Sequence, residues 1–289
     1  MICYEPVPVI TGPTASGKTE YAIRLAREID AEIVSADSMQ IYRHMDIGTA
    51  KAAPSERGGI PHHMIDIVDP GVRFSVAEYK KMALQCIEDI LSRGRRAIVA
   101  GGAGLYISAL VYNIQYPALA PDPAYRGRLE DRALESGTAS LHAELALLDP
   151  AAAAKIHTND QKRIIRALEV YHATGTTISE HERLSRSEPP RYTYELIGLQ
   201  VERGELYRRI DARVDRMLED GLVEEARALY ERYAKHGTAR QAIGYKELFT
   251  YFEGGCTLDE AIAKIKTETR RYAKRQMTWF RSMPEINWV

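Results

Sequence analysis

The stretch VITGPTASGKTEYAI, residues 9–23, contains the pattern G-x-x-x-x-G-K-T, which is typical of a loop that cradles phosphate groups. The apolar run VPVIT precedes the loop and favours a buried strand, and residues 18–29 follow with the apolar spacing of a helix. In a strand–loop–helix unit, backbone N–H groups and the helix N-terminus face the phosphate oxygens. The stretch therefore predicts a diphosphate site, but it does not identify the molecule that carries the diphosphate.

The loop also supplies a cation and a hydroxyl. Lys18 can place its charge on the phosphates, and the hydroxyl of Thr19 can reach Mg²⁺, which is the cofactor that we expect. The residues expected to bind the diphosphate are Gly12, Pro13, Thr14, Ala15, Ser16, Gly17, Lys18 and Thr19.

The remainder of the first part of the chain alternates between strand-like and helical segments. Strands are expected in AEIVSAD, HHMIDIV and RRAIVAGG, and helices in residues 75–94, where Ser75 can cap the N-terminus, and in GLYISALVYN. Such alternation predicts an α/β fold: a parallel sheet that contains the phosphate loop and is covered by helices.

The pattern changes after residue 116. Residues 117–192 show little strand signal, and three helical segments, 122–137, 140–156 and 159–175, lie between the proline-rich joints PALAPDP and SEPPRY. We therefore predict an all-helical insertion over 117–192 in a core built from 1–116 and 193–289. The second part of the core should hold one strand, YELIGLQV, and then the helices 205–221, 222–233, 241–254 and 257–283.

Composition limits the possible classes of protein. The formal net charge of −1 gives no global basic field, although a local basic surface remains possible. The 3 cysteines have no metal-binding spacing and fit a reducing compartment. No apolar run is long enough to cross a bilayer, and the N-terminus does not have the pattern of a signal peptide. We expect a cytoplasmic protein and, by default, a monomer.

Asp37 follows the second predicted strand, at the sheet edge where ligands bind in open parallel sheets. A carboxylate there can coordinate Mg²⁺ or accept a proton from an incoming nucleophile. It can equally serve as a helix N-cap. The residues alone leave these interpretations evenly balanced.

Several long motifs in a fixed order resemble the tRNA dimethylallyltransferases, also called tRNA isopentenyltransferases. They are GPTASGKT, SADSMQIYRHMDIGTAK, PHHMIDIVDP, FSVAEY, GGAGLY, NDQKRIIRALEVY, QAIGYKEL and KRQMTWFR. The resemblance runs nearly from end to end. The sequence carries no Cys/His zinc module of the kind that eukaryotic relatives append, so we expect the bacterial form of the family.

The resemblance implies transfer of a dimethylallyl group from dimethylallyl diphosphate to N6 of the adenine on the 3′ side of the tRNA anticodon. It implies that Lys18, Thr19 and Arg213 act on the diphosphate and that Asp37 is the base. Arg209 and Arg213 lie on one helical face. Without the family, that face would favour a solvated basic surface paired with nearby acids.

The resemblance also places tRNA contacts, and it makes the insertion a clamp on the anticodon stem. Taken alone, each basic cluster is more typical of a solvated face. Trp279 and Phe280 are expected to be core residues. The positions expected to contact tRNA are Asp37, Ser38, Met39, Gln40, Ala103, Arg126, Lys162, Arg163, Arg166, Gln241, Gly244, Tyr245, Lys246, Lys274, Arg275, Gln276 and Arg281.

Ala103 stands where the family more often has threonine, which removes a hydroxyl near the RNA. Three alternatives remain open: a P-loop kinase with ATP in the loop, a prenyltransferase acting on free AMP or ADP, and an RNA-binding protein without catalysis. RRAIVAGG ends without the aspartate that kinases and related enzymes favour, whereas HHMIDIVD retains acids.

Overall fold

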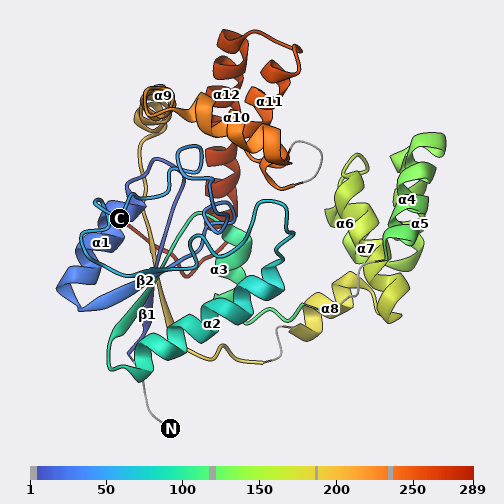
Figure 1. The fold of residues 1–289 in the computed structure, drawn as a ribbon. Helices are drawn as coiled ribbons and strands as arrows, with labels where there is room; N and C mark the ends of the chain where they lie inside the picture. The colour runs from blue at the N-terminus through green and yellow to red at the C-terminus, as the bar shows by residue number, and fades with distance from the viewer. Residues whose placement is uncertain (1–4, 117–121, 186–187, 234–236) are drawn as a thin grey trace. The chain divides into compact units, whose positions relative to one another are not determined.

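The structure, a computed structural model, describes residues 5–116, 122–185, 188–233 and 237–289 (Figure 1). The chain forms two compact units: Met1–Val111 together with Tyr192–Val289, and Tyr112–Arg191. The helical unit thus begins at Tyr112, before the expected boundary at 117. The joint PALAPDP lies mostly outside the described residues.

The larger unit contains a parallel sheet, as predicted. Its strand order is β3-β2-β4-β1-β5-β6, and every pair of neighbouring strands is parallel. The strands are β1 (Val7–Thr11), β2 (Ala31–Ser35), β3 (His62–His63), β4 (Arg96–Ala100), β5 (Tyr194–Gly198) and β6 (Asn287–Trp288). The strand expected over HHMIDIV is therefore only two residues long, and β6 was not predicted because so short a strand carries no periodic signal.

Helices cover the sheet because its strands are apolar on both faces (Figure 1). Helix α1 (Lys18–Glu28) packs its alanines against an apolar cluster that includes Ile10, Ile33 and Ile98. Helix α2 (Val76–Ser92) packs on β2 and β4 and is followed by α3 (Gly104–Val111). The predicted cap is confirmed: Ser75 and Glu78 form a capping box.

The carboxyl ends of the central strands bring three loops to one edge of the sheet. The phosphate loop follows β1, residues 36–41 follow β2, and residues 101–103 follow β4. The last two loops touch closely, because a Cβ on Gly101 would lie 2.1 Å from the carbonyl oxygen of Ala36. Only glycine permits this approach.

The C-terminal helices build a second apolar cluster with residues 41–45. They are α9 (Arg203–Glu219), α10 (Leu222–Tyr233), α11 (Tyr245–Phe252) and α12 (Leu258–Arg281). A 3₁₀ turn, η1 (Ala239–Gln241), precedes α11. The single helix expected over 241–254 is wrong. Gly244 takes a φ of 97°, which ends one segment before α11 begins.

The second unit is helical throughout its described residues. It contains α4 (Pro123–Ser136), α5 (Thr138–Leu148), α6 (Pro150–Lys155), α7 (Gln161–Thr174) and α8 (Ile178–Ser185). Its own core includes Leu129, Leu141 and Ile164. The helix expected over 140–156 is divided, because Asp149 caps a new helix that starts at Pro150. No helix in the described part of the chain has the length and apolarity of a membrane span.

Candidate functional site

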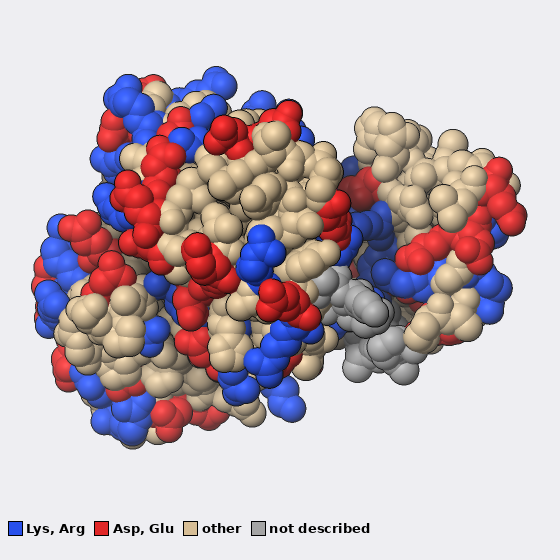
Figure 2. Space-filling view, turned by 45° about the horizontal axis from the view of Figure 1, so that its top comes forward, with Lys and Arg blue, Asp and Glu red and all other residues tan. Residues whose placement is uncertain are grey.

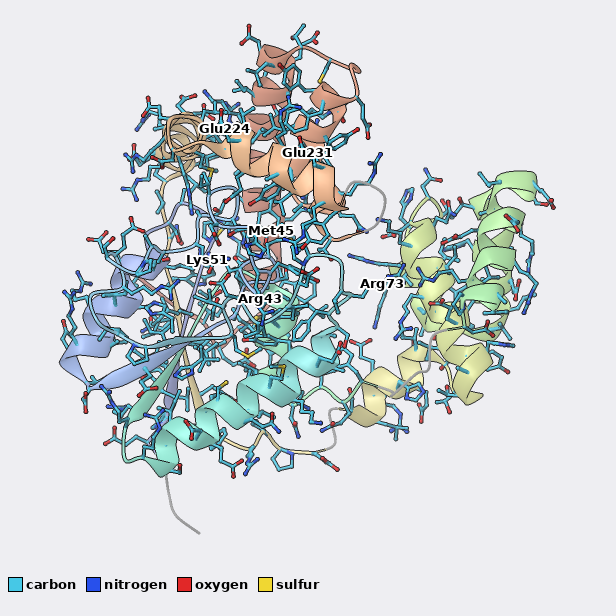
Figure 3. The ribbon with its side chains drawn as sticks, in the orientation of Figure 1. Arg43, Met45, Lys51, Arg73, Glu224 and Glu231 are labelled. Atoms are coloured by element: carbon cyan, nitrogen blue, oxygen red, sulfur yellow. The ribbon has the colours of Figure 1, made fainter. Side chains whose placement is uncertain are left out.

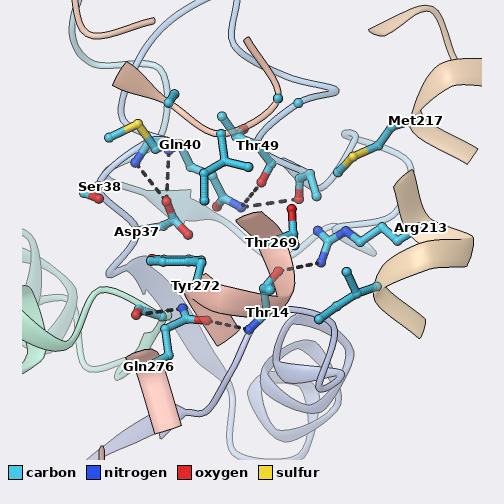
Figure 4. Close-up of a pocket in the computed structure, with 18 of the residues that line it drawn as sticks. Thr14, Asp37, Ser38, Gln40, Thr49, Arg213, Met217, Thr269, Tyr272 and Gln276 are labelled. Atoms are coloured by element: carbon cyan, nitrogen blue, oxygen red, sulfur yellow. Dashed lines mark hydrogen bonds between the residues drawn. The ribbon is translucent and has the colours of Figure 1, made fainter. Parts of the chain in front are cut away.

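A cavity of about 370 Å³ lies at the carboxyl edge of the sheet within the larger unit (Figure 4). Loops after β1, β2 and β4 form one side, and helices α9 and α12 form the other. The cavity brings together residues that are far apart in the sequence. Those predicted above to be functional and found in its lining are Thr14, Lys18, Thr19, Asp37, Ser38, Met39, Gln40, Arg213, Gln241, Gly244, Lys246, Arg275 and Gln276.

The backbone of the phosphate loop takes positive φ angles at two glycines. Gly12 and Gly17 take φ values of 144° and 90°, and a Cβ on Gly12 would lie 2.8 Å from the carbonyl oxygen of Leu199. The hydroxyl oxygen of Ser16 is buried and has no hydrogen-bond partner among the described residues. A buried, unsatisfied hydroxyl in a loop of this shape fits a site for anionic oxygens.

Lys18 lies at the floor of this loop, where its ammonium group donates to the carbonyl oxygen of Pro13 at 2.6 Å. Burial and the nearby charge of Arg213 lower the pKa of Lys18 to about 7, against a smaller opposing effect of Asp37. An anion beside the amine would favour its protonated form.

Arg213, on α9, faces the same loop. Its Nη1 atom donates to the hydroxyl of Thr14 at 3.3 Å, and burial lowers its pKa. The alternative of a solvated, acid-paired face is wrong for this residue, because Asp211 and Asp215 pair with cations of α12. The same alternative is correct for Arg209, which pairs with a glutamate one turn earlier on α9.

Asp37 caps a turn, not the helix that the N-cap alternative required, and one of its oxygens stays available to a bound molecule. One carboxylate oxygen accepts from the backbone N–H groups of Met39 at 2.8 Å and Gln40 at 3.3 Å, which caps the turn after β2. The other oxygen makes no hydrogen bond with the described residues, and the side chain lines the cavity (Figure 4). A capping carboxylate can therefore also accept a proton from a bound molecule.

The comparisons with known proteins agree on one family. A family model described as IPP transferase matches residues 40–283. The chain belongs to the IPP transferase family. A tRNA dimethylallyltransferase of Geobacillus thermodenitrificans is 50% identical over 284 residues, which cover 98% of this chain and 90% of the relative.

Two solved structures resemble this IPP transferase over 99% of its chain. A tRNA isopentenylpyrophosphate transferase of Bacillus halodurans is 44% identical, with a TM-score of 0.73 and 90% of its own chain covered. A eukaryotic dimethylallyltransferase described as acting on tRNA is 31% identical, with a TM-score of 0.82 and 74% of its own chain covered.

A glutamate that the sequence did not single out shapes the cavity of this transferase. Both carboxylate oxygens of Glu225, on α10, accept from the backbone N–H groups of residues 46–48 at 2.9–3.0 Å and from the hydroxyl of Tyr245 at 2.7 Å. The turn that Glu225 holds supplies the carbonyl oxygens of Thr49 and Ala50, which accept from Nε2 of Gln40 at 3.2 and 3.3 Å.

Gln40 is consequently restrained. Its amide nitrogen donates to the backbone carbonyl oxygens of Thr49 and Ala50, so its amide oxygen is the atom left to meet a base edge in the expected contact with tRNA. Tyr245 was expected to contact tRNA but is fully buried, since its ring fills the space beside Gly48, where a Cβ would lie 2.5 Å away.

Gln276 was also expected to contact tRNA, and the structure gives it another task. The side chain is buried, donates to the carbonyl oxygen of Gly102 at 2.9 Å and accepts from the backbone N–H of Thr14 at 2.8 Å. Gln276 therefore ties α12 to the phosphate loop and to the loop after β4. In the latter loop, Ala103 is half-buried and donates its N–H to Ala36 at 3.0 Å.

The basic residues expected to contact tRNA differ in how they are paired. In the helical unit, Arg126 forms a two-pronged ion pair with Glu169, which Arg166 also approaches. Lys162 and Arg163 are exposed on α7. Of the remaining candidates, Lys246 pairs with its neighbour Glu247, whereas Lys274, Arg275 and Arg281 have no acidic partner among the described residues.

The residues at the cavity fit Mg²⁺ bound mainly through its substrate. No group of three or more His, Cys, Asp or Glu side chains among the described residues could hold a metal ion by itself. Mg²⁺, however, is commonly held by one or two protein oxygens together with substrate phosphates. The hydroxyl of Thr19 lines the cavity and supplies a donor of that kind.

Proposed function

We propose that this IPP transferase moves a dimethylallyl group from dimethylallyl diphosphate to N6 of the adenine on the 3′ side of the tRNA anticodon, releasing diphosphate. The observation that carries the proposal is the single cavity lined by the phosphate loop, Arg213 and Asp37. The cavity thus places groups that can bind an anion, the diphosphate, beside a carboxylate that can accept a proton from the attacking amine. The similarity to tRNA dimethylallyltransferases and a tRNA isopentenylpyrophosphate transferase suggests the dimethylallyl group and tRNA as the two partners.

In the reaction, a bond forms between N6 of adenine and the allylic carbon while the bond from that carbon to the diphosphate oxygen breaks. The electron pair of the broken bond leaves with the diphosphate. Lys18, Arg213 and the loop N–H groups face those oxygens and stabilise the developing charge. When bound, Mg²⁺, for which Thr19 is the proposed ligand, would add a further positive charge at the leaving oxygens.

The nitrogen that attacks must also lose a proton. The lone pair of an exocyclic amine is delocalised into the ring, so proton removal during bond formation raises its reactivity. Asp37 is held in place by its own turn and has a free oxygen toward the cavity, so it accepts that proton. Adenine reaches the cavity only after it leaves the anticodon stack.

The test offers the protein labelled dimethylallyl diphosphate and Mg²⁺ with two unmodified tRNAs. One carries adenine next to the anticodon, and the other carries guanine at that single position. We expect label in the first tRNA alone. Equal labelling of both would contradict the proposed adenine, and no labelling of either would contradict the proposed reaction.

A further inference from the structure

The last two turns of α12 differ in charge from the turns before them. Lys266, Arg270 and Arg271 each pair with an acid within the described residues. Residues 269–284 contain no Asp or Glu. In that segment Lys274, Arg275 and Arg281 lack an acidic partner among the described residues, which suits a surface that meets phosphates.

Trp279 lies among these cations and is 38% exposed, although the sequence favoured a core position for it; its neighbour Phe280 is fully buried, as expected. A hydrogen bond and a close backbone contact fix the position of the indole ring. Its Nε1 atom donates to the hydroxyl of Ser108 at 3.1 Å, and a Cβ on Gly104 would lie 2.5 Å from its ring. Leu105, beside Gly104 in α3, is also exposed.

The position of Trp279 follows from the helix period. Arg275 and Gln276, which line the cavity, precede Trp279 by one turn on the same face of α12. The loop after β4 runs alongside, because Gly102 meets Gln276 and Gly104 meets Trp279. The exposed indole thus lies one turn beyond the cavity lining, next to the backbone that forms the cavity edge.

We propose that Trp279 is a stacking surface for an unpaired nucleobase adjacent to the adenine that enters the cavity. The inference rests on the proposed function. Removing one base from a loop unstacks its neighbours, and single-stranded bases are bound chiefly by aromatic faces flanked by cations. The bond to Ser108 fixes the indole before RNA arrives, which lowers the entropy cost of stacking on it.

The test uses the tryptophan fluorescence of the protein. The sequence contains 2 tryptophans, so Trp288→Phe leaves Trp279 as the only one. An unmodified anticodon stem–loop hairpin is titrated into this variant, and its prenylation by the variant is measured separately. We expect quenching that saturates with the binding of the hairpin. Unchanged emission at saturation, with normal prenylation, would overturn the stacking role and leave the proposed function intact; absence of prenylation would instead count against the proposed function.

A second measurement separates stacking from structural damage. We expect Trp279→Leu to raise the Kd of the hairpin roughly 5- to 150-fold, the range that base stacking on aromatic side chains supports. Trp279→Phe keeps an aromatic face and should lose much less. A hairpin with abasic sites beside the target adenine should bind wild type and Trp279→Leu alike. An equal loss by Trp279→Leu on both hairpins would overturn the proposal.

Discussion

At the scale of single residues, the capping bonds of Asp37 are compatible with the proposed role as a base. Its two oxygens are used differently: one holds the turn through Met39 and Gln40, and the other is left toward the cavity. The sequence could not separate the two roles because both require a short carboxylate at a strand end.

Asp37→Asn is the substitution that separates these roles, because an amide oxygen can still accept from the turn but cannot take a proton. We expect the rate of transfer to fall roughly 10²- to 10⁴-fold, the usual contribution of a general base, with the Kd for tRNA and the unfolding midpoint nearly unchanged. Single-turnover transfer and equilibrium RNA binding measure the two effects. Transfer within a few-fold of wild type would remove Asp37 from the base role.

We expect Lys18 to make the proposed binding of diphosphate depend on pH. Its pKa of about 7 in the free protein rises when an anion binds, so binding above neutral pH takes up a proton. The affinity for inorganic diphosphate should therefore fall as pH rises from about 7, by up to about tenfold per unit. Titration calorimetry across this range measures it. Lys18→Met is the control, because its pH profile reports the diphosphate's own titration without that of Lys18. Parallel pH profiles of the two proteins would contradict this assignment.

At the scale of elements, the turn over residues 45–50 is fixed from outside by α10. Lys51, which lies in the loop between β2 and β3 (Figure 3), bonds to the carbonyl of Tyr42 and to two aspartates, while Glu225 binds the N–H groups of the turn. Carbonyl oxygens of this turn accept hydrogen bonds from the side chain of Gln40. A helix far away in sequence thus sets the shape of one wall of the cavity.

Glu225→Ala should destabilise both the fold and the cavity, because it leaves three backbone N–H groups and the hydroxyl of Tyr245 without their acceptor. We expect the free energy of unfolding to fall by at least about 1–3 kcal/mol. Glu224, its exposed neighbour on α10 (Figure 3), is the matched control, for which Glu224→Ala should change it by less than about 0.5 kcal/mol. Equal urea midpoints for the two variants would contradict the bracing role.

The sequence predicts what is local and misses what depends on distant packing. The phosphate loop, the sheet and the cap at Ser75 were predicted because their signals lie within a few residues of one another. The bond from Thr14 to Gln276 joins positions 262 apart, and no local pattern announces it. Burial of Tyr245 and the division of the helix at Gly244 likewise depend on packing.

At the scale of the whole molecule, charge is mixed rather than concentrated. Figure 2 shows Lys and Arg interspersed with Asp and Glu over the visible face of the larger unit, as the net charge of −1 suggests. RNA binding by such a protein depends on small groups of cations instead of a global field. The exposed pair on α7 of the helical unit is one such candidate group.

Lys162→Gln combined with Arg163→Gln tests the proposal that the helical unit clamps the anticodon stem. Both side chains are exposed on α7, so the fold should tolerate the change. We expect a higher KM for tRNA, a shallower dependence of tRNA binding on salt, and an unchanged KM for dimethylallyl diphosphate. Equal increases in both KM values would indicate damage to the fold and contradict the clamp.

We propose above that the phosphate loop of this protein holds a prenyl diphosphate for transfer to RNA. The most direct test offers labelled dimethylallyl diphosphate with Mg²⁺ in parallel to unmodified tRNA and to AMP, with ATP turnover followed beside them. We expect label in tRNA alone and no ATP turnover. Label in AMP would make the protein a prenyltransferase of free nucleotides, and ATP turnover without labelling would make it a kinase or hydrolase; either result would overturn the proposed function.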